Sequence, residues 1–194
     1  MNKNDLRYRK TDDAIRNAFL ECVDREEFDD VHVSDICRIA GISRRAFYDH
    51  YTDKYALLEA VYADLKKDIR DNLTDGIITQ MIEGDFLEPT RWHMQQVYEH
   101  RDIIRPLLMV DKTEYTKMCI ELYYDLPWSR VVPDYYKKKE DPRVFLSISY
   151  LVNGMVGFIA EWLNNIDRYT FDEALMLMTS LCERPAALFI KQIM

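Results

Sequence analysis

The stretch GISRRAFYDHYTDKYALL, residues 41–58, decides the fold of the N-terminal part of the chain. Gly41 can adopt the left-handed conformation that ends many helices, and Ser43 can accept hydrogen bonds from the first turn of a new helix. We predict a short helix capped by Ser34 before this turn and another after it, running to Tyr51. Two short helices joined by so tight a turn are typical of a helix-turn-helix.

Helices on either side complete the domain. Thr11–Glu27 places apolar residues at helical spacing, and Thr11 is the expected N-cap of that first helix. After the helix-turn-helix, a further helix is expected to start near residues 52–54 and to end before Gly76. The sequence therefore predicts an N-terminal helical domain of about 70 residues.

Residues 41–58 resemble the core of the DNA-binding domain of the tetracycline-repressor (TetR) family, and the resemblance covers about residues 8–62. It implies an all-α chain with an N-terminal three-helix helix-turn-helix DNA-binding domain and a larger C-terminal helical ligand-binding and dimerisation domain. We place these domains at residues 1–70 and 71–194. Tyr51 stands where the family more often has Phe, and we expect its hydroxyl to find a partner near phosphate.

DNA contacts are expected around the second helix of the motif. That helix enters the major groove with its N-terminus first, and Arg44 and Arg45 lie at that end. Arginine can donate two hydrogen bonds to guanine O6 and N7. The family resemblance implies contacts with the DNA backbone for Tyr48, His50 and Lys54. The predicted DNA-binding residues are Ser34, Ser43, Arg44, Arg45, Tyr48, His50 and Lys54.

Several of these residues also have a purely structural interpretation. Arg44 and Arg45 fit a solvated helix face, and a histidine at a helix end, such as His50, often caps carbonyl groups. Asp49 would be repelled by phosphates unless it accepts a hydrogen bond from a cytosine amino group. The basic residues within positions 7–10 form either an arm that touches DNA or a tail.

The C-terminal domain is also expected to be helical. Asp75–Thr90 is the expected irregular join, and Val144–Leu163 fits a core or interface helix. Thr170 and Glu173 fit a capping box that opens the last helix. Further helices are expected at Arg91–His100, Asp102–Val110 and Tyr115–Leu126, with a solvated loop over 127–142.

Small residues on one face of the Val144–Leu163 helix indicate close approach of another helix, either from a second copy or from the same chain. The last helix is the expected companion. The predicted dimer-interface residues are Ser147, Gly154, Gly157, Leu175, Met178 and Cys182.

Methionine and aromatic residues in the middle helices suit either a plain core or a pocket for an apolar small-molecule effector. A few polar side chains lie among them as candidate contacts. The predicted ligand-binding residues are Trp92, His93, Gln96, Met109, Met118, Tyr123 and Phe158.

Composition and missing motifs exclude other classes. Only 5 Gly and 6 Pro in 194 residues are few for the turns of an all-β protein. Met1–Asp5 has no apolar signal segment, so the expected location is cytoplasmic, and uncharged Val144–Ala160 is expected to be buried in protein rather than in a membrane. The four cysteines include no C-x-x-C pair, and phosphate-binding, dinucleotide-binding and nucleophile-elbow patterns are absent from the sequence. We therefore predict no enzyme activity, no cofactor and no metal.

The sequence thus predicts a ligand-responsive transcriptional regulator, a repressor that binds a palindromic double-stranded DNA operator as a homodimer. The net charge of −8 neither supports nor excludes DNA binding, because charges on the protein interact with DNA only within about 8–10 Å. The alternatives are a helical protein-interaction module that docks an acidic partner, and a TetR-like activator or co-regulator without a small-molecule ligand.

Overall fold

The computed structural model describes residues 6–194, and its regular elements over this range are all helical. The chain forms two compact units: one holds the residues up to Lys67 together with Asp102–Lys112, and the other holds Asp68–Arg101 together with Thr113–Met194. The expected all-α class, with a helix-turn-helix domain and a larger C-terminal helical domain, is confirmed. The boundary expected at residue 70 stays a prediction, and Met1–Asp5, where no signal peptide is expected, lies outside the described residues.

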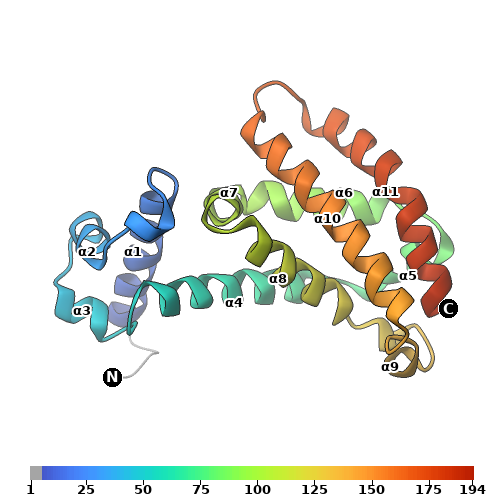
Figure 1. Ribbon diagram of the computed structural model, residues 1–194, viewed down its shortest axis with the longest axis horizontal. Coiled ribbons are helices and arrows are strands. Elements are labelled where there is room, and N and C mark those ends of the chain that lie inside the picture. The colour runs from blue at the N-terminus through green and yellow to red at the C-terminus, as the bar shows by residue number, and fades with distance from the viewer. Residues whose placement is uncertain (1–5) are drawn as a thin grey trace. The chain divides into compact units, whose positions relative to one another are not determined.

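The first unit gathers its short helices around the start of a long one (Figure 1). Phe19 and Ile15 of the first helix, Ile36 of the second and Phe47 of the third are fully buried with Leu57, and they form one apolar core. Burial of such side chains stabilises the unit by about 1.5–3 kcal/mol each. The elements are α1 (Leu6–Val23), η1 (Phe28–Asp30), α2 (Val33–Ala40), α3 (Arg44–Tyr48) and α4 (Lys54–Asn72), with α7 (Arg101–Val110) grouped with them.

The turn between α2 and α3 has the expected geometry. Gly41 adopts the left-handed conformation with φ 66°, and the Ser43 hydroxyl accepts a hydrogen bond from the Ala46 N–H at 3.1 Å. α3 ends at Tyr48, so the expectation that it continues to Tyr51 is wrong. The helix-turn-helix itself is confirmed.

Two expected caps are wrong. α1 is already helical at Leu6, and Thr11 lies inside it with its hydroxyl donating to the Arg7 carbonyl. Residues 7–10 therefore belong to a helix rather than to a tail, and their contact with DNA stays a prediction. α2 begins at Val33, one residue before Ser34, and its N-cap makes no side-chain hydrogen bond.

The second unit is built around two long helices that lie side by side, α10 and α11 (Figure 1). The capping box at Thr170 and Glu173 is confirmed, since both of its hydrogen bonds are present. α10 is long and apolar enough to cross a membrane, and 44% of its most apolar window is buried inside the chain. A core helix can pass the same test of length and composition, so this one helix is weak evidence for a membrane span. The elements are α5 (Asp75–Glu83), α6 (Leu87–Glu99), α8 (Lys112–Tyr124), η2 (Trp128–Arg130), α9 (Tyr135–Lys138), α10 (Pro142–Asn164) and α11 (Phe171–Ile193).

Two segments are more ordered than expected. The join expected over 75–90 contains α5, because the Thr74 hydroxyl caps that helix and Gly84, at φ 85°, ends it. The loop expected over 127–142 contains η2 and α9, because Trp128 and Tyr135 are buried and Trp128 packs on Phe189 at 5.3 Å between ring centroids. Gly, Pro and Lys residues indicated irregular structure in both segments, but neighbouring apolar residues that become buried stabilise helices there.

Candidate DNA-binding surface

The start of α3 presents two arginines to solvent. Ser43 caps the helix, and Arg44 and Arg45 are exposed directly after it. Among residues 6–194, neither guanidinium has a hydrogen bond or ion pair. Both side chains are therefore available to base edges.

Tyr48 lies at the other end of α3. Its ring packs edge to face on buried Phe47, with centroids 5.5 Å apart, and the side chain remains 56% exposed. The aromatic ring is thus fixed while the hydroxyl end is accessible to a phosphate. Ser34, the remaining candidate on the helix-turn-helix, is half-buried in the first turn of α2.

A carboxylate of α1 holds the segment that follows α3. Asp12 Oδ1 accepts hydrogen bonds from His50 Nδ1 at 3.0 Å and from the Tyr51 hydroxyl at 2.8 Å, while Oδ2 accepts from Arg16 Nε at 2.8 Å. Because a carboxylate only accepts, Nδ1 of His50 carries the shared proton. Arg16 in turn lies 3.0 Å from Asp64. We call these five residues the Asp12 network; it ties α1 and α4 to the end of the recognition helix.

The Asp12 network changes the interpretation of two side chains. The His50 side chain is only 1% exposed and stacks on Tyr8 with ring centroids 3.9 Å apart, which leaves no free ring surface for DNA. Tyr51 finds its partner in Asp12, so the expectation of a partner near phosphate is wrong. Both residues position the recognition helix from inside the unit.

The protonation states of Asp12 and Tyr51 agree with the hydrogen bonds of the Asp12 network. Partial burial raises the pKa of the Asp12 carboxyl, but hydrogen bonds from Arg16, Tyr51 and His50 outweigh burial and leave that pKa lowered. Burial and the hydrogen bond to Asp12 raise the pKa of the Tyr51 hydroxyl. Asp12 is therefore ionised and Tyr51 neutral near neutral pH, as the hydrogen bonds require.

Lys54 at the start of α4 serves the turn after α1. Its Nζ donates to the carbonyls of Phe28 at 2.7 Å, Asp29 at 3.0 Å and Val31 at 3.0 Å. An ammonium group has three protons, so these carbonyls use all of them. The ammonium also lies 4.6 Å from the centre of the Phe28 ring. Lys54 thereby fixes η1, the segment that leads into α2.

The predicted ligand-binding residues do not form one group. His93 and Tyr123 line a cavity of about 40 Å³ in the second unit, and Phe158 lines a groove of about 480 Å³ between α10 and α11. Gln96 is buried and accepts a hydrogen bond from the Asn72 amide, Met118 is buried, and Trp92 is half-buried. Met109 is 59% exposed on α7 of the first unit, so it lines neither space.

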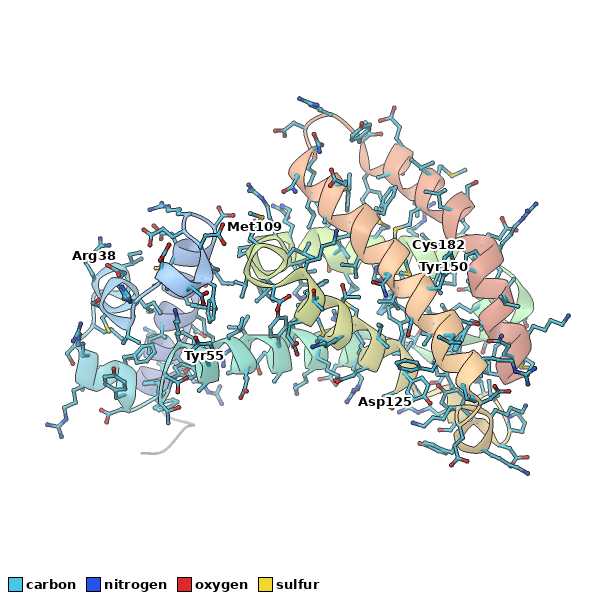
Figure 2. The ribbon with its side chains drawn as sticks, viewed as in Figure 1. Arg38, Tyr55, Met109, Asp125, Tyr150 and Cys182 are labelled. Carbon is cyan, nitrogen blue, oxygen red and sulfur yellow. The ribbon has the colours of Figure 1, made fainter. Side chains whose placement is uncertain are left out.

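The predicted interface residues also divide. Gly154 and Cys182 line the groove between α10 and α11, and Ser147 and Gly157 are half-buried on α10 (Tyr150 and Cys182 are labelled in Figure 2). Leu175 and Met178 are buried against the chain's own helices, which leaves them almost no surface for a second chain. Their exposed neighbours on α11, missed at the level of sequence, are Met176, Leu177 and Leu181.

Comparisons with known proteins agree with this geometry. Residues 15–61 match the model of the bacterial regulatory proteins of the tetR family. A 71-residue stretch, 36% of the chain, is 35% identical to the uncharacterized HTH-type transcriptional regulator YxbF of Bacillus subtilis (strain 168), and it spans 19% of that protein.

Solved structures extend the similarity in fold to both units. A TetR transcriptional regulator from Streptococcus agalactiae 2603V superposes with a TM-score of 0.60 at 20% identity, covering 91% of this chain and 95% of that one. The dihydroxyacetone kinase operon activator DhaS superposes with a TM-score of 0.54 at 15% identity, covering 94% and 96%. The family match at residues 15–61 falls on the helices that present Arg44 and Arg45. The helix-turn-helix of this chain, residues 15–61, is therefore that of the bacterial regulatory proteins of the tetR family, and the larger helical domain shares their fold.

Proposed function

We propose that two copies of this chain bind a pseudo-palindromic operator, each placing α3 in a major groove. The observation that carries the proposal is the exposure of Arg44 and Arg45 at the start of α3, where neither side chain is paired with any of residues 6–194. One chain supplies one recognition helix, so a site with two half-sites requires two chains. Each arginine that contacts guanine contributes about 1–3 kcal/mol of base discrimination.

The remaining predicted contacts take separate roles in this proposal. Ser43 and Tyr48 are exposed next to the arginines and suit phosphate contacts, which fix the register of the protein on DNA. Lys54 and His50 act indirectly, because Nζ of Lys54 and Nδ1 of His50 are already bound inside the unit and the His50 side chain is only 1% exposed. Ser34 stays a proposed contact from the start of α2.

We propose the second copy as the partner of the exposed apolar face of α10 and α11. Tyr150 is 72% exposed and Leu146 66% exposed on α10, and they continue into the exposed leucines of α11. A Cβ atom added at Gly154 or Gly157 would meet nothing within 4 Å, so the single chain leaves open space at both glycines. Apolar surface of this kind marks an interaction site, and small residues let a helix of the second copy approach closely.

We further propose that the regulator is cytoplasmic, acts as a repressor and responds to a small molecule bound in the second unit. Leu151, Met178 and Cys182 line both the cavity at His93 and the groove that the second copy would cover. A molecule that displaces them would alter the dimer and hence the spacing of the recognition helices. Such coupling typically changes affinity about 5–150-fold, in both directions. An activator, as DhaS is named, would use the same surfaces with the opposite effect on transcription.

The test of DNA recognition is selection of bound duplexes from a randomised library by the full chain, followed by sequencing. We expect enrichment of two inverted half-sites with centres about 10 base pairs, or a multiple of that, apart. Enrichment of unrelated sequences would reject the proposal and favour a module that docks an acidic protein. A reporter gene downstream of the selected site then separates repression from activation.

A further inference from the structure

His93, a half-buried residue of the second unit, has one buried ring nitrogen without a hydrogen-bond partner in the described part of the chain. Nδ1 of His93 on α6 lies 2.6 Å from the hydroxyl of Tyr123 on α8. Nε2 is buried, and it has no hydrogen-bond partner among residues 6–194. Natural proteins rarely leave a buried polar atom unpaired, so this nitrogen requires an explanation.

The hydrogen-bond arrangement identifies Nε2 as a donor. Burial lowers the pKa of His93 to about 4, so the ring is neutral and carries one proton. If Tyr123 donates to Nδ1, that proton sits on Nε2 and a single group, the Nε2–H, lacks a partner. If Nδ1 donated instead, both the Tyr123 proton and the Nε2 lone pair would be left unpaired. The first arrangement leaves fewer unpaired groups.

The walls around this donor carry no charge. Met81, Phe86 and Met155 line the cavity together with His93 and Tyr123. Burial raises the pKa of Tyr123 and brings that of Cys182, another lining residue, to about 11, so both stay neutral near neutral pH. The remaining lining residues are Pro89, Thr90, Leu151, Met178 and Ala186. A charged ligand would find no counter-ion among these side chains.

The dimensions of the cavity limit the size of the occupant. About 40 Å³ is room for a small group rather than for a large ligand. Three of the lining residues are methionines, whose flexible side chains can move to enlarge the space. Thr90 already donates its hydroxyl proton to the Phe86 carbonyl at 2.6 Å, which leaves the hydroxyl only as an acceptor.

We propose that this cavity is a binding site for a small, uncharged, mostly apolar molecule, held by a hydrogen bond from Nε2–H of His93 to a carbonyl-type acceptor. The inference rests on the proposed ligand response and specifies the chemistry of the ligand. Tyr123 is a positioning residue, because its hydroxyl fixes the tautomer and orientation of the His93 ring.

The test uses the full chain with 15N-labelled histidines and cyclopentanone as the probe. Two-dimensional NMR first reports the tautomer of His93, whose signals are assigned by their loss in His93→Phe. We expect protonated Nε2 and unprotonated Nδ1 in the wild type and a mixture of tautomers in Tyr123→Phe. A wild-type His93 protonated on Nδ1 would overturn the proposal, whatever the folding of the variants.

Titration then measures the role of the acceptor. Cyclopentanone should shift the Nε2 resonance saturably and bind about tenfold more tightly than methylenecyclopentane, which has the same shape without the oxygen. His93→Phe should remove that preference, and cyclopentanecarboxylate should bind more weakly than the ketone. Any of three results would overturn the proposal. The ketone and the hydrocarbon could bind equally, or the carboxylate could bind more tightly than the ketone. The Nε2 resonance could also show no saturable shift up to about 20 mM cyclopentanone, which is the result expected if the cavity holds only a water molecule.

Measurements of ketone binding and of DNA binding on the same sample distinguish failure of this inference from failure of the proposed function. Its affinity for the selected duplex is measured in parallel. Duplex binding without ketone binding rejects only the site at His93. Ketone binding by a chain that prefers no duplex sequence supports the site and rejects the operator proposal.

Discussion

Replacement of Asp12 by alanine tests whether the Asp12 network holds the recognition helix. His50 and Tyr51 would each lose the acceptor of a charge-assisted hydrogen bond, and His50 has almost no exposure to water that could replace it. Each such bond contributes about 1.5 kcal/mol or more. Arg16 also loses its bond to Asp12 Oδ2, but it keeps the largely exposed Asp64 at 3.0 Å, so this loss adds at most about 1 kcal/mol. The expected loss is therefore about 3 kcal/mol.

Hydrogen exchange with mass spectrometry can measure this loss locally. Peptides that cover α1 and residues 44–51 should exchange roughly 100-fold faster in Asp12→Ala, while peptides of α10 and α11 should be unchanged. Asp13→Ala is the matched control, because Asp13 is the exposed neighbour of Asp12 in the same helix. A change below about 1 kcal/mol in Asp12→Ala, or an equal change in the control, would refute the reasoning.

The lowered pKa of Asp12 adds a pH dependence with a fixed sign. A carboxyl whose pKa is lower in the folded state stabilises that state above its unfolded pKa of about 4, and the contribution disappears as the pH falls through the folded value. The difference between wild type and Asp12→Ala should therefore shrink below about pH 4. A difference that grew as the pH fell would contradict the assignment of an ionised Asp12.

Three further substitutions probe the surface itself. Arg44→Ala or Arg45→Ala should reduce discrimination at one half-site position by about 1–3 kcal/mol in anisotropy titrations, and equal losses on selected and scrambled duplexes would exclude a base contact. Lys54→Met should destabilise the first unit by about 2 kcal/mol in exchange experiments, because three carbonyls lose their donor; an unchanged unit with weaker binding to all DNA would instead indicate a phosphate contact. Ser43→Ala should cost about 1 kcal/mol through loss of the cap, as measured by exchange in α3.

Helix ends that depend on residues close together in the chain could be predicted from the sequence. The Gly41 stop, the Ser43 cap and the capping box at Thr170 each depend on residues within one helical turn, and all three are present. The caps expected at Thr11 and Ser34 failed because a helix continues through a suitable cap residue when the preceding residues also favour it.

Contacts between distant residues could not be predicted from spacing. Asp12 lies 38 residues from His50, and His93 lies 30 residues from Tyr123, so no local pattern connects them. Apolar periodicity placed Met178 on a helix but could not tell a face buried within the chain from one open to a second copy. That distinction depends on how α10 and α11 pack.

The most direct test of the central claim compares the selected duplex with the same duplex in which one half-site is scrambled. Fluorescence anisotropy at one salt concentration and sedimentation of the complex give affinity and stoichiometry. Two chains per selected duplex and at least about 100-fold weaker binding to the scrambled duplex would agree with two recognition helices in two half-sites. One chain per duplex with equal affinity for both sequences would contradict it.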